Sequence, residues 1–96
     1  MQQYIITAWD GTDPEALDRR MKVRASHFDG ARILKMNGNF VAGGAMLDEK
    51  GTMIGSTMIV QFDNEEGLQA WMKIEPYITG NVWQKITFHP FRLADV

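Results

Sequence analysis

The chain has no cysteine, so disulfide bonds, redox dithiols and thiolate chemistry are excluded. It also has no long apolar run, and none approaches the roughly 18 residues that a membrane-spanning helix needs. The first residues carry neither the basic segment nor the apolar segment of a secretory signal peptide. We therefore expect a cytoplasmic protein that makes no use of a membrane.

Runs of like charge are absent as well. The chain carries 10 Lys and Arg residues among 12 Asp and Glu residues, for a formal net charge of -2. A nucleic-acid surface needs clustered basic side chains, so no nucleic-acid partner is expected. The 96 residues are 45% hydrophobic and 23% charged, which is typical of a folded chain. A single domain over residues 1–96 is therefore predicted.

Four stretches bounded by turn residues are predicted as strands, and the first of them is rich in aromatic and β-branched residues. These strands are expected at residues 3–9, 39–47, 53–62 and 81–92. The second of them contains Gly43-Gly44. A glycine pair weakens a strand, so it suggests a bulge or a place where another group approaches the backbone closely.

A long helix is predicted between the first two strands, at about residues 14–36. Asp13 is suited to cap it, and Pro14 suits its first position. Apolar residues recur at steps of three and four, which predicts one stripe that faces the core. Its members are Leu17, Met21, Ala25, Phe28 and Ala31. His27 lies roughly a quarter-turn from the centre of this stripe, which places it on the flank of the helix.

A shorter helix is predicted between the third and fourth strands. Asp63 is its expected N-cap. Its apolar face consists of Leu68, Trp71 and Met72. The helix is expected to end at Glu75, because a residue before proline avoids the helical conformation, and residues 77–80 are expected to form a loop.

The order strand, helix, strand, strand, helix, strand predicts an α+β protein of the ferredoxin-like βαββαβ type. Its sheet would be antiparallel and four-stranded, with both helices on one face. Apolar residues alternate with other apolar residues along the strands, so the uncovered face is expected to be apolar too. A homodimer that stacks sheet on sheet would bury that face.

Histidine is scarce, since His27 and His89 are the only two. His27 is the first candidate for acid–base chemistry, because imidazole titrates near neutral pH. Such a role needs a carboxylate that orients the ring, and Glu75 is the candidate, since the two helices lie side by side in this fold. The alternative is a flank histidine bonded to a backbone carbonyl, with Glu75 an exposed acid at a helix end.

His89 is expected at the surface or in the dimer interface. Two histidines so far apart, without the short spacings of metal sites, predict no metal. No motif points to a cofactor.

Several motifs keep a common order and spacing over nearly the whole chain. They are Arg24-x-x-His27, Gly43-Gly44, Gly55-Ser56, Trp71, Glu75-Pro76-Tyr77-x-x-Gly80 and Pro90-Phe91. Together they resemble the YciI-like (YCII-related) family. The resemblance implies a ferredoxin-like fold of the dimeric α/β-barrel type, a homodimer, and a pocket built around a histidine and an acid. The family histidine corresponds to His27, and the family acid, usually aspartate, corresponds to Glu75.

The resemblance also implies a class of chemistry. Reaction types in the family resemble dehydrohalogenation of chlorinated aromatic diols, relatives isomerise lactones, and other members are fused to transcription factors. We therefore expect a cofactor-independent bacterial enzyme that abstracts a proton from a small cyclic or aromatic metabolite. His27 would be the general base or acid, and Glu75 would orient it.

The expected substrate-binding residues are Arg24, Ser56, Gly43, Gly44 and Tyr77. Arg24 is suited to hold an anionic group and Ser56 to donate a hydrogen bond. Three alternatives stay open: a metabolite-sensing regulatory dimer, a structural dimer with a vestigial site, and a small cofactor-independent monooxygenase.

Overall fold

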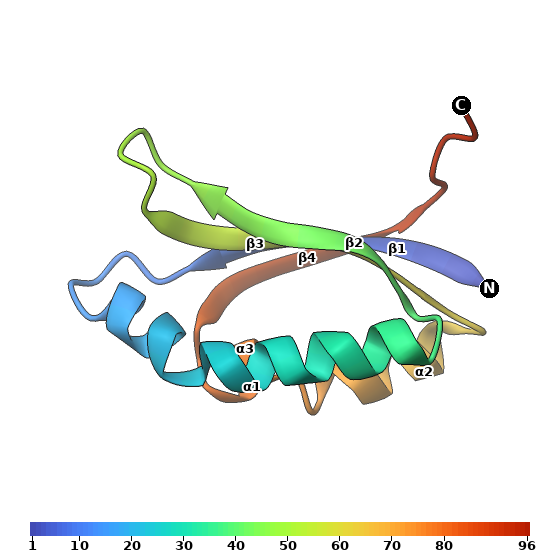
Figure 1. Ribbon diagram of the computed structural model, residues 1–96, viewed down its shortest axis with the longest axis horizontal. Coiled ribbons are helices and arrows are strands. Elements are labelled where there is room, and N and C mark those ends of the chain that lie inside the picture. The colour runs from blue at the N-terminus through green and yellow to red at the C-terminus, as the bar shows by residue number, and fades with distance from the viewer.

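The computed structural model describes residues 1–96, the whole of this sequence. Its elements are β1 (Gln2–Asp10), α1 (Ala16–Met36), β2 (Phe40–Leu47), β3 (Met53–Phe62), α2 (Glu65–Met72), α3 (Pro76–Thr79) and β4 (Trp83–Phe91). The strands form one antiparallel sheet with the order β2-β3-β1-β4. All three helices lie on the same face of this sheet (Figure 1). The predicted ferredoxin-like α+β fold is confirmed.

The core lies between the sheet and the helices, and strand alternation builds it. Along β1 the buried residues are Tyr4, Ile6 and Ala8, at every second position. β3 repeats this pattern, and Met58 and Val60 pair in register with Ile6 and Tyr4. From the helical layer the core receives Leu34, Leu68, Trp71 and Tyr77.

The long helix α1 presents a different side to the sheet from the one that its apolar stripe predicts. Its buried residues are Arg20, His27 and Leu34. Leu17 and Met21, two members of the predicted inward stripe, are 40% and 49% exposed. The predicted stripe is therefore wrong, and His27 lies on the inward face and not on the flank. The physical reason is that polar pairs, described below, hold the inward face against the sheet.

The start of α1 also differs from the prediction. The helix begins at Ala16, after Glu15, and no side chain caps it. The carboxylate of Asp13, the predicted cap, instead accepts two hydrogen bonds from Arg19, at 3.1 and 2.7 Å. Arg19 competes successfully for this carboxylate because a guanidinium forms two charge-assisted bonds with it.

The helix α2 starts one residue later than predicted and ends earlier. Asn64, not Asp63, is its N-cap, and its side-chain oxygen accepts a hydrogen bond from the Gly67 N–H at 3.1 Å. The last helical residue is Met72. The predicted extension of this helix to Glu75 is therefore wrong.

Residues 77–80, predicted as a loop, belong largely to a third short helix, α3. Glu75 is the N-cap of α3, and Pro76 follows it at the start of the helix. Proline suits that position, because its missing N–H has no partner there and its φ is already helical. Pro76 therefore opens a helix where the sequence was interpreted as closing one.

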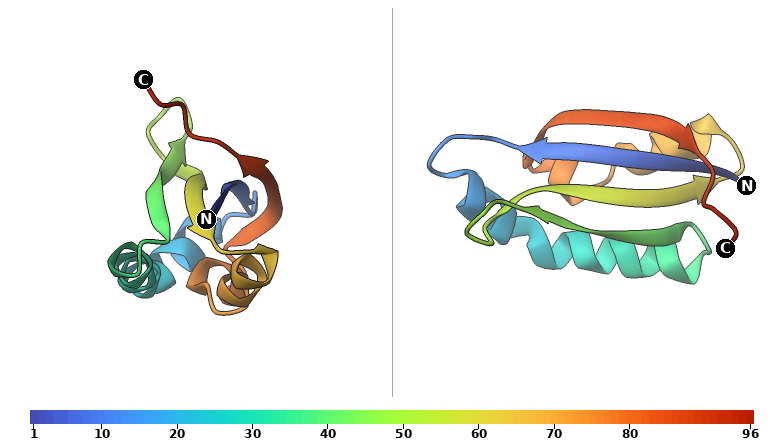
Figure 2. Two further views of the ribbon diagram at one scale, coloured as in Figure 1. Left: turned by 90° about the vertical axis from the view of Figure 1, so that its right-hand side faces the viewer. Right: turned by 90° about the horizontal axis from the view of Figure 1, so that it is seen from above.

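The face of the sheet without helices carries mixed side chains. In the middle of the sheet, Ile5 lies in register with Ile59 on one side and His89 on the other. The next register positions are threonines, and Trp9 near the strand end is 43% exposed. The sheet curls around this face, and the C-terminal end rises on the same side (Figure 2). A second copy stacked here stays a prediction.

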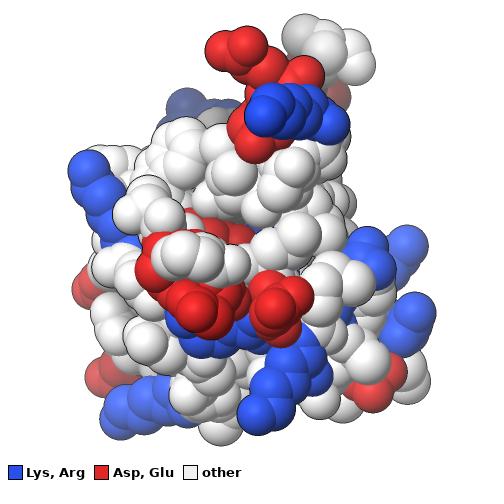
Figure 3. All heavy atoms as spheres, turned by 90° about the vertical axis from the view of Figure 1, so that its left-hand side faces the viewer, with Lys and Arg blue, Asp and Glu red and all other residues white.

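On the face viewed in Figure 3, acidic side chains gather at the centre and basic side chains lie below and beside them. None of the helices combines the length and the apolar character that crossing a bilayer would require.

Candidate active site

The two predicted catalytic residues are in direct contact. His27 projects from α1, and its Nδ1 lies 2.5 Å from Oε1 of Glu75. The same Oε1 accepts a hydrogen bond from the Tyr77 N–H at 3.0 Å, which is the N-terminal cap of α3. The Glu75 side chain is only 1% exposed. A carboxylate held by the first turn of a helix cannot swing away, so it fixes the rotation of the His27 ring.

Two aromatic rings hold the imidazole from other directions. The Tyr77 ring is stacked on the His27 ring, with centroids 3.9 Å apart and an interplanar angle of 14°. Trp83 meets it edge-on, at 6.0 Å and 72°. The imidazole is therefore a positioned group and not a freely rotating one.

The second ring nitrogen of His27 stays free. Nδ1 faces Glu75, while Nε2 makes no hydrogen bond within the chain. The enclosed side-chain atoms that lack a partner are Arg20 Nε and Tyr77 Oη, so Nε2 is not enclosed. In the neutral ring with its proton on Nδ1, that proton is donated to the carboxylate, and Nε2 presents a lone pair. This tautomer suits a general base.

A second buried polar group lies beside this pair. Nη1 of Arg20 lies 3.1 Å from both carboxylate oxygens of Asp10, and Nη2 donates to the Ser56 hydroxyl oxygen at 2.8 Å. Nε1 of Trp83 donates to the same oxygen at 3.2 Å. Because both acceptor positions of Ser56 are used, its own O–H remains available to donate. Burial raises the pKa of the Asp10 carboxyl, and the Arg20 guanidinium opposes that rise.

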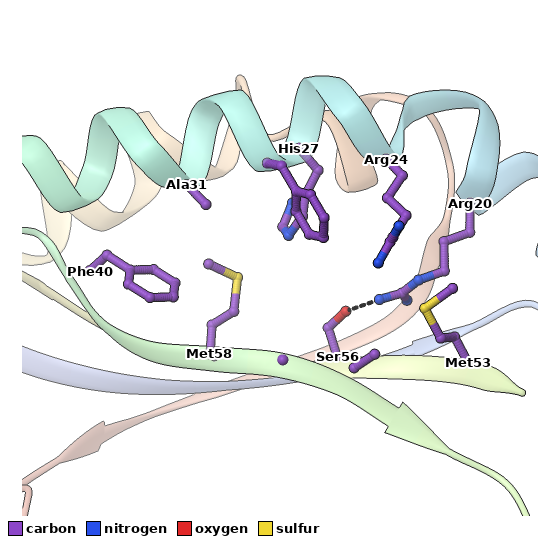
Figure 4. A pocket seen from close by; sticks show the side chains of 12 residues that line it. Arg20, Arg24, His27, Ala31, Phe40, Met53, Ser56 and Met58 are labelled. Atoms are coloured by element: carbon purple, nitrogen blue, oxygen red, sulfur yellow. Dashed lines mark hydrogen bonds between the residues drawn. The ribbon is translucent and has the colours of Figure 1, made fainter. Parts of the chain in front are cut away.

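A pocket of about 250 Å³ lies between α1 and the β2–β3 half of the sheet. His27, Arg24 and Ser56 line it, as do Gly43 and Gly44 of β2. Figure 4 shows His27, Arg24 and Arg20 descending from the helix toward Ser56 on the strand below. The apolar part of the wall is formed by Phe28, Ala31, Phe40, Ala45, Met53 and Met58. The structure thus brings five of the seven predicted site residues around one cavity.

The other two predicted residues lie behind the pocket. Glu75 does not line it and contacts it through His27. Tyr77, expected to contact a substrate, has no exposed surface, because α3 directs its ring into the core beneath His27. Burial also raises the pKa of the Tyr77 hydroxyl. In this structure Tyr77 supports the imidazole and does not reach the cavity.

Arg20 and Asp10 belong to the site although no motif in the sequence marks them. A signal existed for Arg20, because it precedes His27 by seven residues and therefore lies on the same face of a helix. If His27 faces a pocket, Arg20 does too. Asp10 gave no such signal, since an aspartate before Gly11 at the end of a strand is also typical of an ordinary turn. No group of three or more His, Asp or Glu side chains is arranged to hold a metal ion.

The main elements follow the order βαββαβ and form an antiparallel sheet covered by helices on one face (Figure 1), which defines an α+β protein of the ferredoxin-like type. The YCII-related domain matches residues 3–92 of this chain. The chain therefore belongs to the YCII-related family, and the resemblance drawn from its motifs is confirmed.

Known relatives agree with this assignment. The chain is 30% identical over 95 residues to Protein YciI of Escherichia coli O6:H1, a match that covers 93% of this chain and 95% of the relative. Among solved structures, the fold is similar to that of 5-chloro-2-hydroxyhydroquinone dehydrochlorinase (TftG) from Burkholderia phenoliruptrix, in complex with 2,5-dihydroxybenzoquinone. That likeness has a TM-score of 0.81 at 18% identity and covers 96% of this chain and 95% of the other.

A further solved structure with the same fold is a dimeric ferredoxin-like protein of unknown function from Jannaschia. Its TM-score is 0.55 at 14% identity, and the match covers 97% of this chain and all of the other. At these identities the two structures establish the fold alone.

Proposed function

We propose that this protein is a cofactor-independent enzyme in which His27 abstracts a proton from a small cyclic or aromatic metabolite, in an elimination or an isomerisation. The observation that carries the proposal is the buried contact between His27 Nδ1 and Glu75 Oε1, with the histidine also lining the pocket. An imidazole held by a carboxylate on one nitrogen, and open on the other, is the arrangement that general-base chemistry requires.

The proton movements follow from that geometry. Nε2 of His27 accepts a proton from a substrate C–H or O–H, and the imidazolium that forms is stabilised by the Glu75 carboxylate. The electron pair left on the substrate becomes a new double bond. In an elimination the leaving group departs with its bonding pair, and in an isomerisation the proton returns to a different atom. The free O–H of Ser56 is placed to donate to a substrate oxygen.

The similarity to a dehydrochlorinase supports the choice of the first compounds to test. That protein is named for action on 5-chloro-2-hydroxyhydroquinone. Chlorinated hydroquinones test the elimination, and small unsaturated lactones test the isomerisation. Chloride release and ultraviolet absorbance follow the two reactions without a coupling enzyme.

Replacing His27 with alanine is the decisive measurement. A positioned general base contributes about 10²–10⁴-fold in rate, so His27→Ala should lower turnover of an accepted compound by that factor. His89→Ala is the matched control for the loss of a histidine, because His89 does not line the pocket. Its sedimentation should equal that of the wild type, which needs checking because His89 is in register with Ile5 of the uncovered face. Near wild-type turnover by His27→Ala would refute the mechanism.

The second candidate function is a regulatory module that binds a metabolite in this pocket without converting it. If the wild type binds compounds of this panel but converts none, the protein belongs to that second class.

We also propose that the protein is a cytoplasmic homodimer, since the uncovered, curled sheet face offers a surface for a second copy and a solved structure of this fold is described as dimeric. Sedimentation equilibrium tests that assembly.

A further inference from the structure

The pocket contains one positive charge that no acidic side chain balances. Arg20 is paired with Asp10, and His27 is in contact with Glu75. Arg24 forms neither an ion pair nor a hydrogen bond, and its guanidinium carbon lies 4.6 Å from the centroid of the Phe28 ring. None of the residues that line the pocket is acidic. The two acids that balance the other basic groups lie behind them, outside the pocket wall.

Arg24 is also aimed into the cavity. It extends from α1 toward the sheet between His27 and Arg20, above Ser56 (Figure 4). A guanidinium carries five N–H donors in one plane, and here all five lack a partner within the chain. Its guanidinium carbon lies over the Phe28 ring, and this cation–π contact uses none of the N–H donors, which lie along the edge of the guanidinium plane and are left for a ligand. The group that fits such an edge is a planar oxyanion, which can accept two parallel hydrogen bonds.

The size and walls of the pocket restrict the rest of the ligand. Its volume of about 250 Å³ is below the range of roughly 300–1,000 Å³ that is typical of sites for drug-sized molecules. The side chains of Phe28, Phe40, Met53 and Met58 form its apolar surfaces. On the strand side, Gly43 leaves little spare room, since a Cβ there would lie 3.1 Å from Met58 Cγ. A flat single ring suits this space.

We infer that the ligand of this pocket is a single-ring monoanion, whose one ring-borne oxyanion is bound by Arg24. The oxyanion is a carboxylate or an ionised ring hydroxyl, and the ring lies against the apolar wall. This inference uses the same pocket as the proposed function and specifies its substrate class, but it concerns binding and does not depend on proton transfer by His27. Arg24 sets the charge specificity of the site.

Titration calorimetry with matched probes tests the charge requirement. Benzoate and 4-nitrophenolate are planar monoanions that represent the two oxyanion types, benzamide has the shape of benzoate without the charge, and phenyl phosphate carries a second charge. The wild type should bind at least one of the two monoanions more than about tenfold more tightly than benzamide, because hydrogen bonds to charged groups contribute roughly that much or more. Phenyl phosphate should bind more weakly than the preferred monoanion.

Two arginine variants locate the effect. Arg24→Gln should weaken binding of the preferred monoanion by about 10- to 100-fold and leave benzamide unchanged. Arg32→Gln removes the same charge from the same helix at a side chain that is 70% exposed and outside the pocket, so it should bind like the wild type. Circular dichroism of both variants confirms that the fold is retained.

Each contrary result overturns the inference. The wild type would contradict it by binding benzoate, 4-nitrophenolate and benzamide with equal affinity, or by binding neither monoanion at about 10 mM. Tighter binding of phenyl phosphate than of the preferred monoanion would also contradict it. So would equal affinity of Arg24→Gln and Arg32→Gln for that monoanion. His27→Ala should still bind the monoanion. If the arginine variants bind as expected but His27→Ala still turns over the substrate, the proposed function is wrong and the role of Arg24 stands. If His27→Ala loses turnover but Arg24→Gln binds the monoanion as the wild type does, the role of Arg24 is wrong and the proposed function stands.

Discussion

Removing the side chain of Glu75 should destabilise the fold through two separate hydrogen bonds. Oε1 of this residue accepts the N–H of Tyr77 at the start of α3 and contacts Nδ1 of His27. In Glu75→Ala the helix loses its cap, and the ring N–H of His27 is left buried without an acceptor. Because the carboxylate is 1% exposed, solvent cannot substitute at either position without entering the core.

The expected loss is the sum of these two effects. Losing a capping side chain costs about 0.5–2 kcal/mol. Leaving a buried donor unsatisfied costs about 1–3 kcal/mol. The free energy of unfolding should therefore fall by about 1.5–5 kcal/mol, from a total of roughly 5–14 kcal/mol that is typical of a chain of this length. A loss of that size lowers Tm by about 6–40 °C, at about 4–8 °C for each kcal/mol in a domain of this size.

The matched variant is Glu75→Gln, which keeps an acceptor oxygen in place and removes the charge. It should retain the cap and the contact with His27, and its free energy of unfolding should stay within about 1 kcal/mol of the wild type. Urea unfolding followed by circular dichroism measures both variants, at one fixed protein concentration because a dimer would make stability depend on concentration.

The reasoning fails if alanine and glutamine at position 75 reduce stability equally, since that result would assign the effect to the charge and not to the hydrogen bonds. It also fails if Glu75→Ala unfolds at the same urea concentration as the wild type. Turnover should not follow stability in these variants. Glu75→Gln should be nearly as stable as the wild type but slower, because its side chain keeps the His27 ring oriented and no longer stabilises an imidazolium. A stable but slow Glu75→Gln protein would separate these two contributions.

Two further predictions concern other parts of the fold. Hydrogen bonds from Arg19 lower the pKa of Asp13 from 3.8 to about 2, so the folded pKa lies below the unfolded one. The stabilisation is then present above about pH 4 and lost as the pH falls toward 2, and Asp13→Asn should flatten the pH dependence of the urea midpoint in that window. Gly55→Ala should cost about 1–3 kcal/mol, because its Cβ would collide with the Ala8 carbonyl oxygen of the neighbouring strand. Gly44→Ala, whose Cβ meets nothing within 4 Å, should stay within about 0.5 kcal/mol in thermal unfolding.

The order and type of the main elements could be predicted because they depend on local patterns. Alternation along β3 separates buried Ser56, Met58 and Val60 from their half-buried neighbours, and the sequence shows that alternation directly. Helix and strand order then leaves few topologies, and the ferredoxin-like one followed.

The orientation of α1 could not be predicted from periodicity, because its determinants are remote in sequence. Hydrophobic spacing selects the face of Leu17 and Met21, whereas the structure buries Arg20 and His27. The acid that contacts His27 is 48 residues away in the chain. Helical periodicity assigns polar residues to the solvent side, because it does not account for partners on other elements.

Contact between His27 and Glu75 was predicted from the family resemblance and from the expected neighbourhood of the helices, but Glu75 was assigned the wrong local role. It was placed at the C-terminal end of a helix, where a carboxylate is unfavourable, and it lies at the N-terminal end of another. The dipeptide Glu75-Pro76 is compatible with both, because proline ends one helix as readily as it begins the next. Only the folded structure shows whether Glu75 ends one helix or begins the next.

Two faces of α1 compete for the sheet, and this competition bears on how the molecule reaches its final shape. Rolling the helix about its axis would bury the hydrocarbon of Leu17 and Met21 and expel two polar groups into water. The observed rotational setting of the helix is the one in which Arg20 and His27 contact the acids Asp10 and Glu75. The ion pair Arg20–Asp10 and the contact His27–Glu75 thus position the pocket residues and also favour one packing of the helix on the sheet.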